Sequence, residues 1–331
     1  MNFMKMLFLI MLIFSSLISI SSNSWFSMWI GLEMNLLFFI PLMSDNKLLS
    51  SESSIKYFLI QSLGSLILMF SFLLLLFYFK EIYKIFMMIS LLLKMGAAPF
   101  HFWFPIVIEG LSWINSFILM TWQKLSPMIL ISYIFNIKLM ILIIFFSSII
   151  SNLMGMNQNS LRKLLAFSSI NHLTWMISSL FISNLMMMMY FLFYSMMTFS
   201  MIIYFKMFNI SYINQLYSTF FFNKYFKLFI IFNFLSYGGL PPFMGFFPKW
   251  LIIQNLCLLN HFFLMIVLIF SSLIYLYLYI RLIFNMMMFN FIENNWIMYK
   301  YMNFNFYKLM ISMSLFNLWM IFLFPSLYFF L

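Results

Sequence analysis

A small set of ionisable side chains lies inside long apolar stretches of this 331-residue sequence, and these are the residues that could do chemistry. They are Glu33, Lys94, Lys124, His172 and Lys249. A charged side chain at the centre of a bilayer costs ~2.5–3.5 kcal/mol, so three lysines and a glutamate together cost on the order of 10 kcal/mol. Burial lowers the pKa of a lysine and a nearby carboxylate raises it, so a lysine between these influences can take up and release a proton. The expected chemistry is proton transfer.

Glu33 and His172 differ from the lysines in what they can contribute. Glu33 is the only carboxylate deep in such a stretch, so it is the expected partner of a lysine. A local ion pair of purely structural value could explain Glu33 with one lysine, but not the others. His172 can carry a proton on either ring nitrogen, and Ser168, Ser169 and Asn171 beside it could hold bridging water. The alternative for His172 is a packing histidine.

Three further titratable residues have weaker claims. His101 follows helix-breaking residues, whose freed carbonyl groups would pin its ring. Glu109 lies near the inner end of an apolar stretch and could be a proton-uptake group or a solvated loop residue. His261 falls at the edge of a stretch and is assigned no role.

Two of the lysines adjoin helix breakers. Lys94 is followed at once by Gly96 and Pro99, and Lys249 follows a run of glycines and prolines at 238–248. Proline removes a backbone donor and clashes with the preceding turn, so a helix must break or kink there. A break inside hydrocarbon is tolerated only where the freed carbonyls face protein or water. A buried charge beside a broken helix therefore indicates a conduction path.

The composition predicts a polytopic membrane protein. Hydrophobic residues make up 66% of the chain and charged residues 7%, whereas a soluble domain carries roughly 25% charged residues. The apolar runs are continuous over about 20 residues, which favours helices over a β-barrel. Dividing them at polar clusters gives about eleven spans. The expected spans are 4–20, 24–44, 55–79, 84–107, 112–133, 137–155, 160–182, 185–207, 226–259, 262–289 and 305–330.

The two interrupted spans, 84–107 and 226–259, are the fourth and the ninth, so they cross the membrane in opposite directions. Paired interrupted segments in matching positions indicate inverted repeats with sites near the midplane. We expect an all-α fold in one membrane domain. Residues 1–135 and 136–290 would form two inverted five-helix repeats, and 291–331 a C-terminal loop and helix.

The loop charges predict the orientation. One side collects most of the basic residues, so the positive-inside rule places the N-terminus inside and the C-terminus outside. The inner set is Lys5, Lys47, Lys56, Arg162, Lys163, Lys206, Lys224, Lys227, Arg281 and Lys300, and the outer set is Lys80, Lys84 and Lys138. The first span has no cleavage site after it and is expected to be retained. Residue usage, with 49 Phe and 35 Met, is typical of an organellar gene, so the inner side would be the mitochondrial matrix.

Several functions are excluded. The net charge of +11 is scattered and forms no patch for nucleic acid. Cys257 is the single cysteine, which rules out an intrachain disulfide, a cysteine-ligated iron–sulfur cluster and a thiolate zinc site, and we expect no metal site. No glycine-rich phosphate loop, dinucleotide fingerprint or Ser/His/Asp set is present. Redox chemistry would need cofactors held by other chains.

Five separated motifs carry a specific resemblance, in order and spacing. They are Trp29–Asn35, Lys94–Trp103, Thr121–Pro127, Leu161–His172 and Gly238–Trp250. The chain resembles the family of subunit 2 of NADH dehydrogenase (ubiquinone), the mitochondrially encoded, antiporter-like subunit of respiratory complex I. The resemblance covers residues 1 to about 285 and implies about eleven helices, as in other animal members.

The resemblance implies a membrane-arm subunit that conducts protons along a wet polar axis at mid-membrane. It implies that Glu33 pairs with Lys94, that Lys124 and Lys249 continue the axis, and that His172 lies between the two halves. NADH, FMN, iron–sulfur clusters and ubiquinone would be bound by partner subunits and no cofactor by this chain. The implied partners are other complex I membrane-arm subunits, lipids with cardiolipin as a candidate, water and protons, in the mitochondrial inner membrane. The chain departs from many relatives at Ile106, often polar there, which leaves the proton-uptake route open.

Two other functions compete with a proton-conducting subunit. One is a stand-alone cation/proton antiporter, but a cation site needs deep oxygen ligands, and Glu33 is the only deep carboxylate. The other is a structural spacer whose lysines pair only locally. Replacing Lys94 or Lys249 by methionine separates these cases, because a spacer would keep proton pumping coupled to NADH oxidation.

Overall fold

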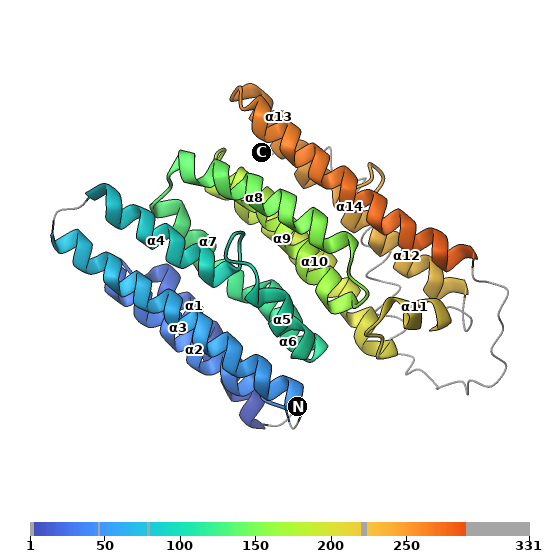
Figure 1. Cartoon of the computed structure of the whole chain (residues 1–331), viewed down its shortest axis with the longest axis horizontal. Helices are drawn as coiled ribbons and strands as arrows, with labels where there is room; N and C mark the ends of the chain where they lie inside the picture. Colours follow the sequence, from blue (N-terminus) through green and yellow to red (C-terminus); the bar gives the residue numbers. More distant parts are fainter. Residues whose placement is uncertain (1–2, 46, 78–79, 220–223, 289–331) are drawn as a thin grey trace. The chain divides into compact units, whose positions relative to one another are not determined.

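The computed structural model describes residues 3–45, 47–77, 80–219 and 224–288 (Figure 1). Over these residues the chain is almost wholly helical, and the only extended pairing among them is an isolated β-bridge between Ser160 and Tyr212. Six of the described helices are long and apolar enough to cross a membrane. The prediction of an all-α membrane fold is confirmed for this part. The expected span 305–330, with the rest of 291–331, lies outside the described residues.

The helices follow the hydropathy pattern. In the first half of the chain they are α1 (Phe3–Ser21), α2 (Trp25–Met43), α3 (Leu48–Leu76), α4 (Lys80–Met95), α5 (Trp103–Gly110), α6 (Trp113–Met120) and α7 (Trp122–Tyr133). They continue as α8 (Ile137–Met156), α9 (Leu161–Ser179), α10 (Asn184–Phe208), α11 (Ile213–Thr219), α12 (Lys224–Gly238), α13 (Phe246–Leu258) and α14 (Phe262–Met288).

Both expected helix breaks are present. The span 84–107 is divided between α4 and α5, and the span 226–259 between α12 and α13. Gly96, the first residue after α4, has φ 72°, and Gly239, the first residue after α12, has φ 80°. Backbone in this left-handed region is accessible to glycine at no steric cost, which explains why glycine stands at both breaks. A third interruption, at Thr121 between α6 and α7, was not among the predicted breaks.

The chain divides into two compact units, which we describe separately. The first unit comprises Met1–Ile150 and Leu165–Leu173, and the second comprises Ser151–Leu164 and Thr174–Leu331. The central part of α9 thus belongs to the first unit. The predicted division into inverted repeats at residue 135 stays a prediction.

In the first unit, α3 packs against α2, α4 and α5, and α4 packs against α7. Helices α1 and α2 approach closely at Gly31, where a Cβ atom would lie 2.7 Å from the backbone nitrogen of Ser19. Helices α3 and α5 approach as closely at Gly110, where a Cβ atom would lie 2.5 Å from the carbonyl oxygen of Leu49. Helix α3 also lies against α4, which it meets at Gly64 beside Lys94, the lysine of the first break.

In the second unit, α12 packs against α10 and α14, and α13 packs against both α10 and α14. A small apolar core joins α10 and α13 through Phe193, Phe247 and Leu251, with Met244 from the break beside them. Tyr275 of α14 donates a hydrogen bond to the carbonyl oxygen of Ser151, 2.8 Å away. This packing holds the two ends of the second break.

Candidate functional site

Four of the five sequence-predicted ionisable residues are buried, and Glu33 is partly buried. Relative exposure is 7% for Lys94, 1% for Lys124, 3% for His172 and 6% for Lys249, and the Glu33 side chain is 24% exposed. Large apolar side chains instead cover the outer faces of the helices, particularly along α1, α3 and α14. This distribution, with charge inside and apolar groups outside, is the one expected for ionisable residues of a membrane protein that serve a pathway.

Glu33 and Lys94 form an ion pair. Lys94 Nζ lies 3.9 Å from Glu33 Oε1, and only 4% of the lysine side chain is exposed. The separation exceeds the normal range of an N–H···O hydrogen bond. Glu33 Oε1 is also buried without a hydrogen-bond partner in the described part of the chain. The two charges therefore attract one another while the carboxylate oxygen retains the capacity to accept a hydrogen bond.

Lys94 is held by the polar groups around the first helix break. It lies in the last turn of α4, whose final carbonyl groups have no partner within the helix. Gln61 of α3 donates a hydrogen bond from Nε2 to the carbonyl oxygen of Lys94, and Trp103 of α5 donates one from Nε1 to that of Leu93, each 3.1 Å long. Neutral donors thus bind two of the last carbonyl groups of α4, while the Lys94 ammonium group lies beside Glu33.

Gly64 of α3 accommodates the stem of the same lysine. A Cβ atom added at Gly64 would lie 3.2 Å from Lys94 Cγ and 3.5 Å from Cε. Gly64 stands three residues after Gln61, so both face α4 from the same side of α3. One helix face thus fixes both the backbone and the side chain of Lys94.

Lys124 lies in the first turn of α7, directly after the interruption at Thr121. Its Nζ donates a hydrogen bond to the carbonyl oxygen of Ser169 in α9, 3.2 Å away, and stands 4.7 Å from the centre of the Phe104 ring. A cation over an aromatic ring is attracted by the ring quadrupole. His172 follows Ser169 by three residues and so lies on the same side of α9. Lys124 thus binds the face of α9 on which His172 lies.

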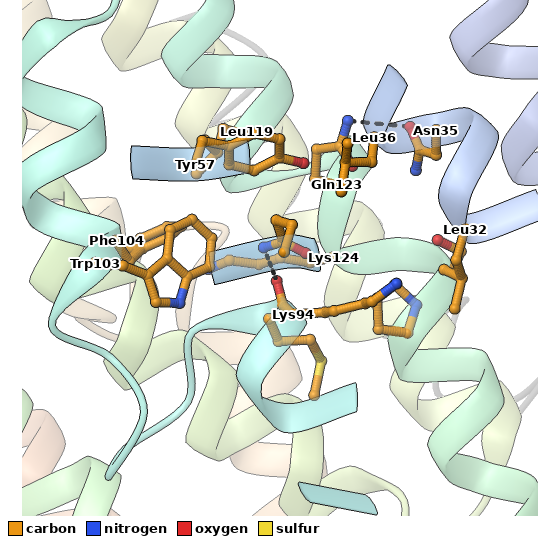
Figure 2. Close-up of a pocket in the computed structure, with 14 residues that line it drawn as sticks. Leu32, Asn35, Leu36, Tyr57, Lys94, Trp103, Phe104, Leu119, Gln123 and Lys124 are labelled. Carbon is orange, nitrogen blue, oxygen red and sulfur yellow. Dashed lines mark hydrogen bonds between the residues drawn. The ribbon is translucent and has the colours of Figure 1, made fainter. Parts of the chain in front are cut away.

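Figure 2 shows a small cavity in the first unit that is lined by both Lys94 and Lys124. Its volume is about 20 Å³, enough for about one water molecule. A hydrogen bond of 3.1 Å from Gln123 Nε2 to Asn35 Oδ1 lies on its wall. The lining side chains are Leu32, Asn35, Leu36, Tyr57, Gln61, Lys94, Met95, Trp103, Phe104, Leu119, Gln123, Lys124, Ser126 and Pro127.

Lys249 lies in the second unit and is bound by a helix end. Its Nζ donates hydrogen bonds to the carbonyl oxygens of Gly238, at 3.1 Å, and Tyr237, at 3.4 Å. These are the last carbonyl groups of α12, where the helix dipole favours a cation. A Cβ atom at Gly239 would lie 2.7 Å from this Nζ, so a glycine is needed here for the ammonium group to reach the backbone.

The other titratable residues have local contacts. His101 Nδ1 lies 3.3 Å from the carbonyl oxygen of Pro99, a backbone contact of the kind expected from the sequence. The His261 ring packs edge-on against Phe181, with ring centres 5.7 Å apart. Ile106 is 48% exposed. Among the residues that the structure describes, no group of three or more His, Cys, Asp and Glu side chains could hold a metal ion.

Several residues of this site were missed by sequence reasoning. Gln61, Gly64 and Ser126 did not stand out, because single polar or small residues are common within membrane helices. The available signal was the presence of four small or polar residues, Gln61, Ser62, Gly64 and Ser65, inside a span that is mostly apolar. Lys227, which the charge distribution assigns to the inner side, has 7% exposure, and this burial does not test the side on which it lies.

Comparison with known proteins identifies the family. The model of the family described as "NADH:quinone oxidoreductase/Mrp antiporter, TM" matches residues 22–275. The NADH-ubiquinone oxidoreductase chain 2 of Anopheles gambiae is 50% identical over 318 residues, covering 93% of this chain and 92% of the relative. The protein of the same description from Aedes aegypti is 48% identical over 309 residues, covering 90% and 91%. The chain belongs to the NADH-ubiquinone oxidoreductase chain 2 family.

The fold agrees with this membership in the chain 2 family. A chain of respiratory complex I from Thermus thermophilus superposes with a TM-score of 0.87 at 20% identity, covering 98% of this chain and 79% of that one. At this identity the likeness concerns the fold alone, which is that of an antiporter-like membrane subunit. The predicted resemblance is confirmed, and the chain 2 family is one of integral membrane proteins.

Proposed function

We propose that this chain, as the chain 2 subunit of proton-translocating NADH-ubiquinone oxidoreductase, carries protons through the membrane along buried ionisable side chains. The residues of the path are Glu33, Lys94, Lys124, His172 and Lys249. The redox reaction takes place on NADH, FMN, iron–sulfur clusters and ubiquinone bound by other subunits of the complex. This chain performs no redox step and contributes the proton-carrying groups.

The observation that carries the proposal is the pair of Lys94 and Glu33 at the first helix break. The ammonium and carboxylate groups stand 3.9 Å apart, with the lysine side chain 4% exposed. An ion pair at this distance stabilises the charged lysine, and movement of the carboxylate removes that stabilisation. The lysine then releases its proton. A redox-driven displacement of either residue would in this way load or unload the path.

Lys124 is suited to the next step. Lys124 lines the same cavity as Lys94. Its ammonium group donates a hydrogen bond to Ser169 of α9, the helix that bears His172. A proton passed from Lys94 to Lys124 would thus arrive next to a histidine that can take it up on one ring nitrogen and release it from the other. Lys249, bound to the end of α12, serves as the proton-carrying group of the second unit.

The remaining expectations form part of the same proposal. The chain has about eleven spans in two inverted five-helix repeats with a C-terminal helix. It lies in the mitochondrial inner membrane with the N-terminus in the matrix and the C-terminus in the intermembrane space, as the distribution of basic loop residues supports. Other membrane-arm subunits, water and lipids, including cardiolipin, surround it.

The experiment uses intact complex carrying Lys94→Met, which keeps the length of the side chain and removes its charge. Complex content is measured on a native gel beside the rate of NADH oxidation and NADH-driven proton movement in sealed vesicles. Lys84→Met, in the same helix α4 but before the break, is the control. We expect Lys94→Met to lose most proton movement at near-normal complex content and the control to retain it. Full coupled pumping by assembled Lys94→Met complex would overturn the proposal and favour a structural spacer. NADH-independent exchange of sodium for protons by the wild type would favour an antiporter.

A further inference from the structure

A large pocket lies within the second unit, where the ends of α8 and α14 meet α11. Its volume is about 640 Å³, within the ~300–1,000 Å³ of ordinary ligand sites. The lining residues come from the segment before α9, from the start of α11 with the residue before it, and from the last turns of α14. They are Gln158, Asn159, Tyr212, Ile213, Asn214, Tyr217, Arg281, Leu282 and Asn285. The pocket is large enough for the polar part of a sizeable ligand.

Arg281 gives the pocket its charge. It is the one charged side chain among the described lining residues, which include no carboxylate. Its Nη2 atom donates a hydrogen bond to the carbonyl oxygen of Met156, 3.0 Å away, which fixes the guanidinium group at the end of α8. A guanidinium group has five N–H donors, so it can bind a further acceptor. Together with the neighbouring amide and phenol groups, it suits a ligand group that carries a single negative charge, such as a phosphate diester.

The position of Arg281 along α14 places the pocket at the edge of the hydrocarbon layer. Residues 262–288 form one apolar helix that is long enough to cross a membrane. Arg281 stands 19 residues after Phe262, roughly 29 Å along the helix, which is close to the ~30 Å thickness of bilayer hydrocarbon. Tyr212 and Tyr217 also line the pocket, and tyrosine is enriched at the boundary between hydrocarbon and water. The pocket therefore lies at the depth of lipid headgroups.

A ridge of exposed apolar side chains on α14 reaches Arg281 from the hydrocarbon side. Phe270 is 64% exposed, Leu273 53% and Tyr277 56%. Spacings of three and four residues place them on one helix face, and Arg281 follows Tyr277 by four residues on that same face. Arg281 stands 11 residues after Phe270, roughly 17 Å along the helix, which is about the depth of one leaflet, or half of the ~30 Å hydrocarbon. An acyl chain along this ridge would thus end at the pocket.

We propose that this pocket binds an anionic phospholipid, with its phosphate group on Arg281 and one acyl chain along the exposed ridge of α14. The amide groups of Asn159 and Asn214 line the pocket and bind the polar headgroup. A single cation matches the single negative charge of a lipid such as phosphatidylglycerol, and a zwitterionic lipid gains less from it. The inference rests only on the membrane placement in the proposed function. It shares no residue with the proposed proton path.

The test uses intact complex in vesicles of equal parts phosphatidylglycerol and phosphatidylcholine with the same acyl chains. In each experiment one of the two lipids carries a photoactivatable group in its acyl chain, and its cross-links to residues 262–288 are measured by peptide mass spectrometry. Arg281→Gln keeps an N–H donor for the Met156 carbonyl group and removes the charge, whereas Arg281→Lys keeps the charge. Lys206→Gln, at an exposed residue in the last turn of α10, is the matched control.

We expect the wild type to cross-link more phosphatidylglycerol than phosphatidylcholine. Arg281→Gln should lower the phosphatidylglycerol yield about fivefold, which corresponds to the contribution of one basic residue at a membrane surface. Arg281→Lys and Lys206→Gln should match the wild type. Equal yields of the two lipids in the wild type, or equal losses in Arg281→Gln and Lys206→Gln, would overturn the site. Displacement of the lipid by added inorganic phosphate would also overturn it, because the ligand would then be a free anion.

A density map of the wild-type complex gives a readout that needs no variant. We expect phospholipid density with its phosphate group within hydrogen-bond distance of the Arg281 guanidinium group. Density of protein in the pocket, from this chain or from a neighbouring subunit, would overturn the lipid site. If Arg281→Gln leaves the cross-links unchanged while Lys94→Met loses pumping, only this inference fails. If Lys94→Met pumps normally while the lipid is bound as expected, only the proposed proton path fails.

Discussion

Lys249 Nζ donates a hydrogen bond to the carbonyl oxygen of Gly238, 3.1 Å away, across the break between α12 and α13. At the first break the lysine lies on the opposite side of the interruption along the chain. There Lys94 precedes the break, and neutral side chains of Gln61 and Trp103 bind the freed carbonyl groups. The charge of Lys249 is therefore stabilised by a helix end and that of Lys94 by a carboxylate. Two breaks of similar composition hold their lysines by different means.

The role of the second break can be tested at Gly239. Alanine here would adopt φ 80° at a cost of about 1–3 kcal/mol, and its Cβ atom would meet Lys249 Nζ at 2.7 Å. We expect Gly239→Ala to lower complex content on a native gel and to reduce pumping per assembled complex. Gly238→Ala is the matched control, because its Cβ atom would have no neighbour closer than 3.6 Å. Equal behaviour of the two variants would show that Lys249 does not depend on this contact.

Gly64→Ala tests whether the placement of the Lys94 stem matters. The new methyl group would lie 3.2 Å from both Lys94 Cγ and Leu93 Cδ2, so these two side chains must shift by a few tenths of an ångström. We expect near-normal assembly and about a two- to tenfold loss of NADH-driven proton movement. Ser62→Ala, on the exposed side of α3, provides the comparison. Unchanged pumping in Gly64→Ala would mean that the ion pair tolerates displacement.

Glu33→Gln removes the carboxylate charge with almost no change in shape. Lys94 then loses the partner that stabilises its protonated form, so we expect lost or reduced pumping at near-normal complex content. Acidification driven by NADH, measured beside a native gel, gives the result. Glu52→Gln is the control, because Glu52 pairs with Lys56 on the exposed surface, where an ion pair contributes little. Assembly failing before pumping would contradict the account.

Hydropathy and breaker residues were sufficient to predict the long described helices and two of the breaks, but not the short helix α11. The first predicted span, 4–20, corresponds to α1 at Phe3–Ser21, because a long apolar run has few other options in a membrane. Glycine and proline mark the breaks after α4 and α12 chemically. The interruption at Thr121 carries no such mark, since the nearby Pro127 lies inside α7, and it could not be predicted.

The candidate site was only partly predictable. Charge in an apolar span identified Lys94, Lys124 and Lys249, because burying charge is costly whatever the tertiary structure. The contribution of Gln61 could not be predicted, since its partner carbonyl lies 33 residues away along the chain. The same holds for Ser126. Its Oγ is buried without a hydrogen-bond partner among the described residues, whereas most helical serines donate to their own backbone.

The most direct measurement is a map of ordered water in the intact complex between Lys94, Lys124 and His172. The account predicts a continuous series of waters and polar side chains joining these residues, each step within about 3.2 Å. A dry, closely packed gap between any two of them, with no room for a water molecule, would contradict it.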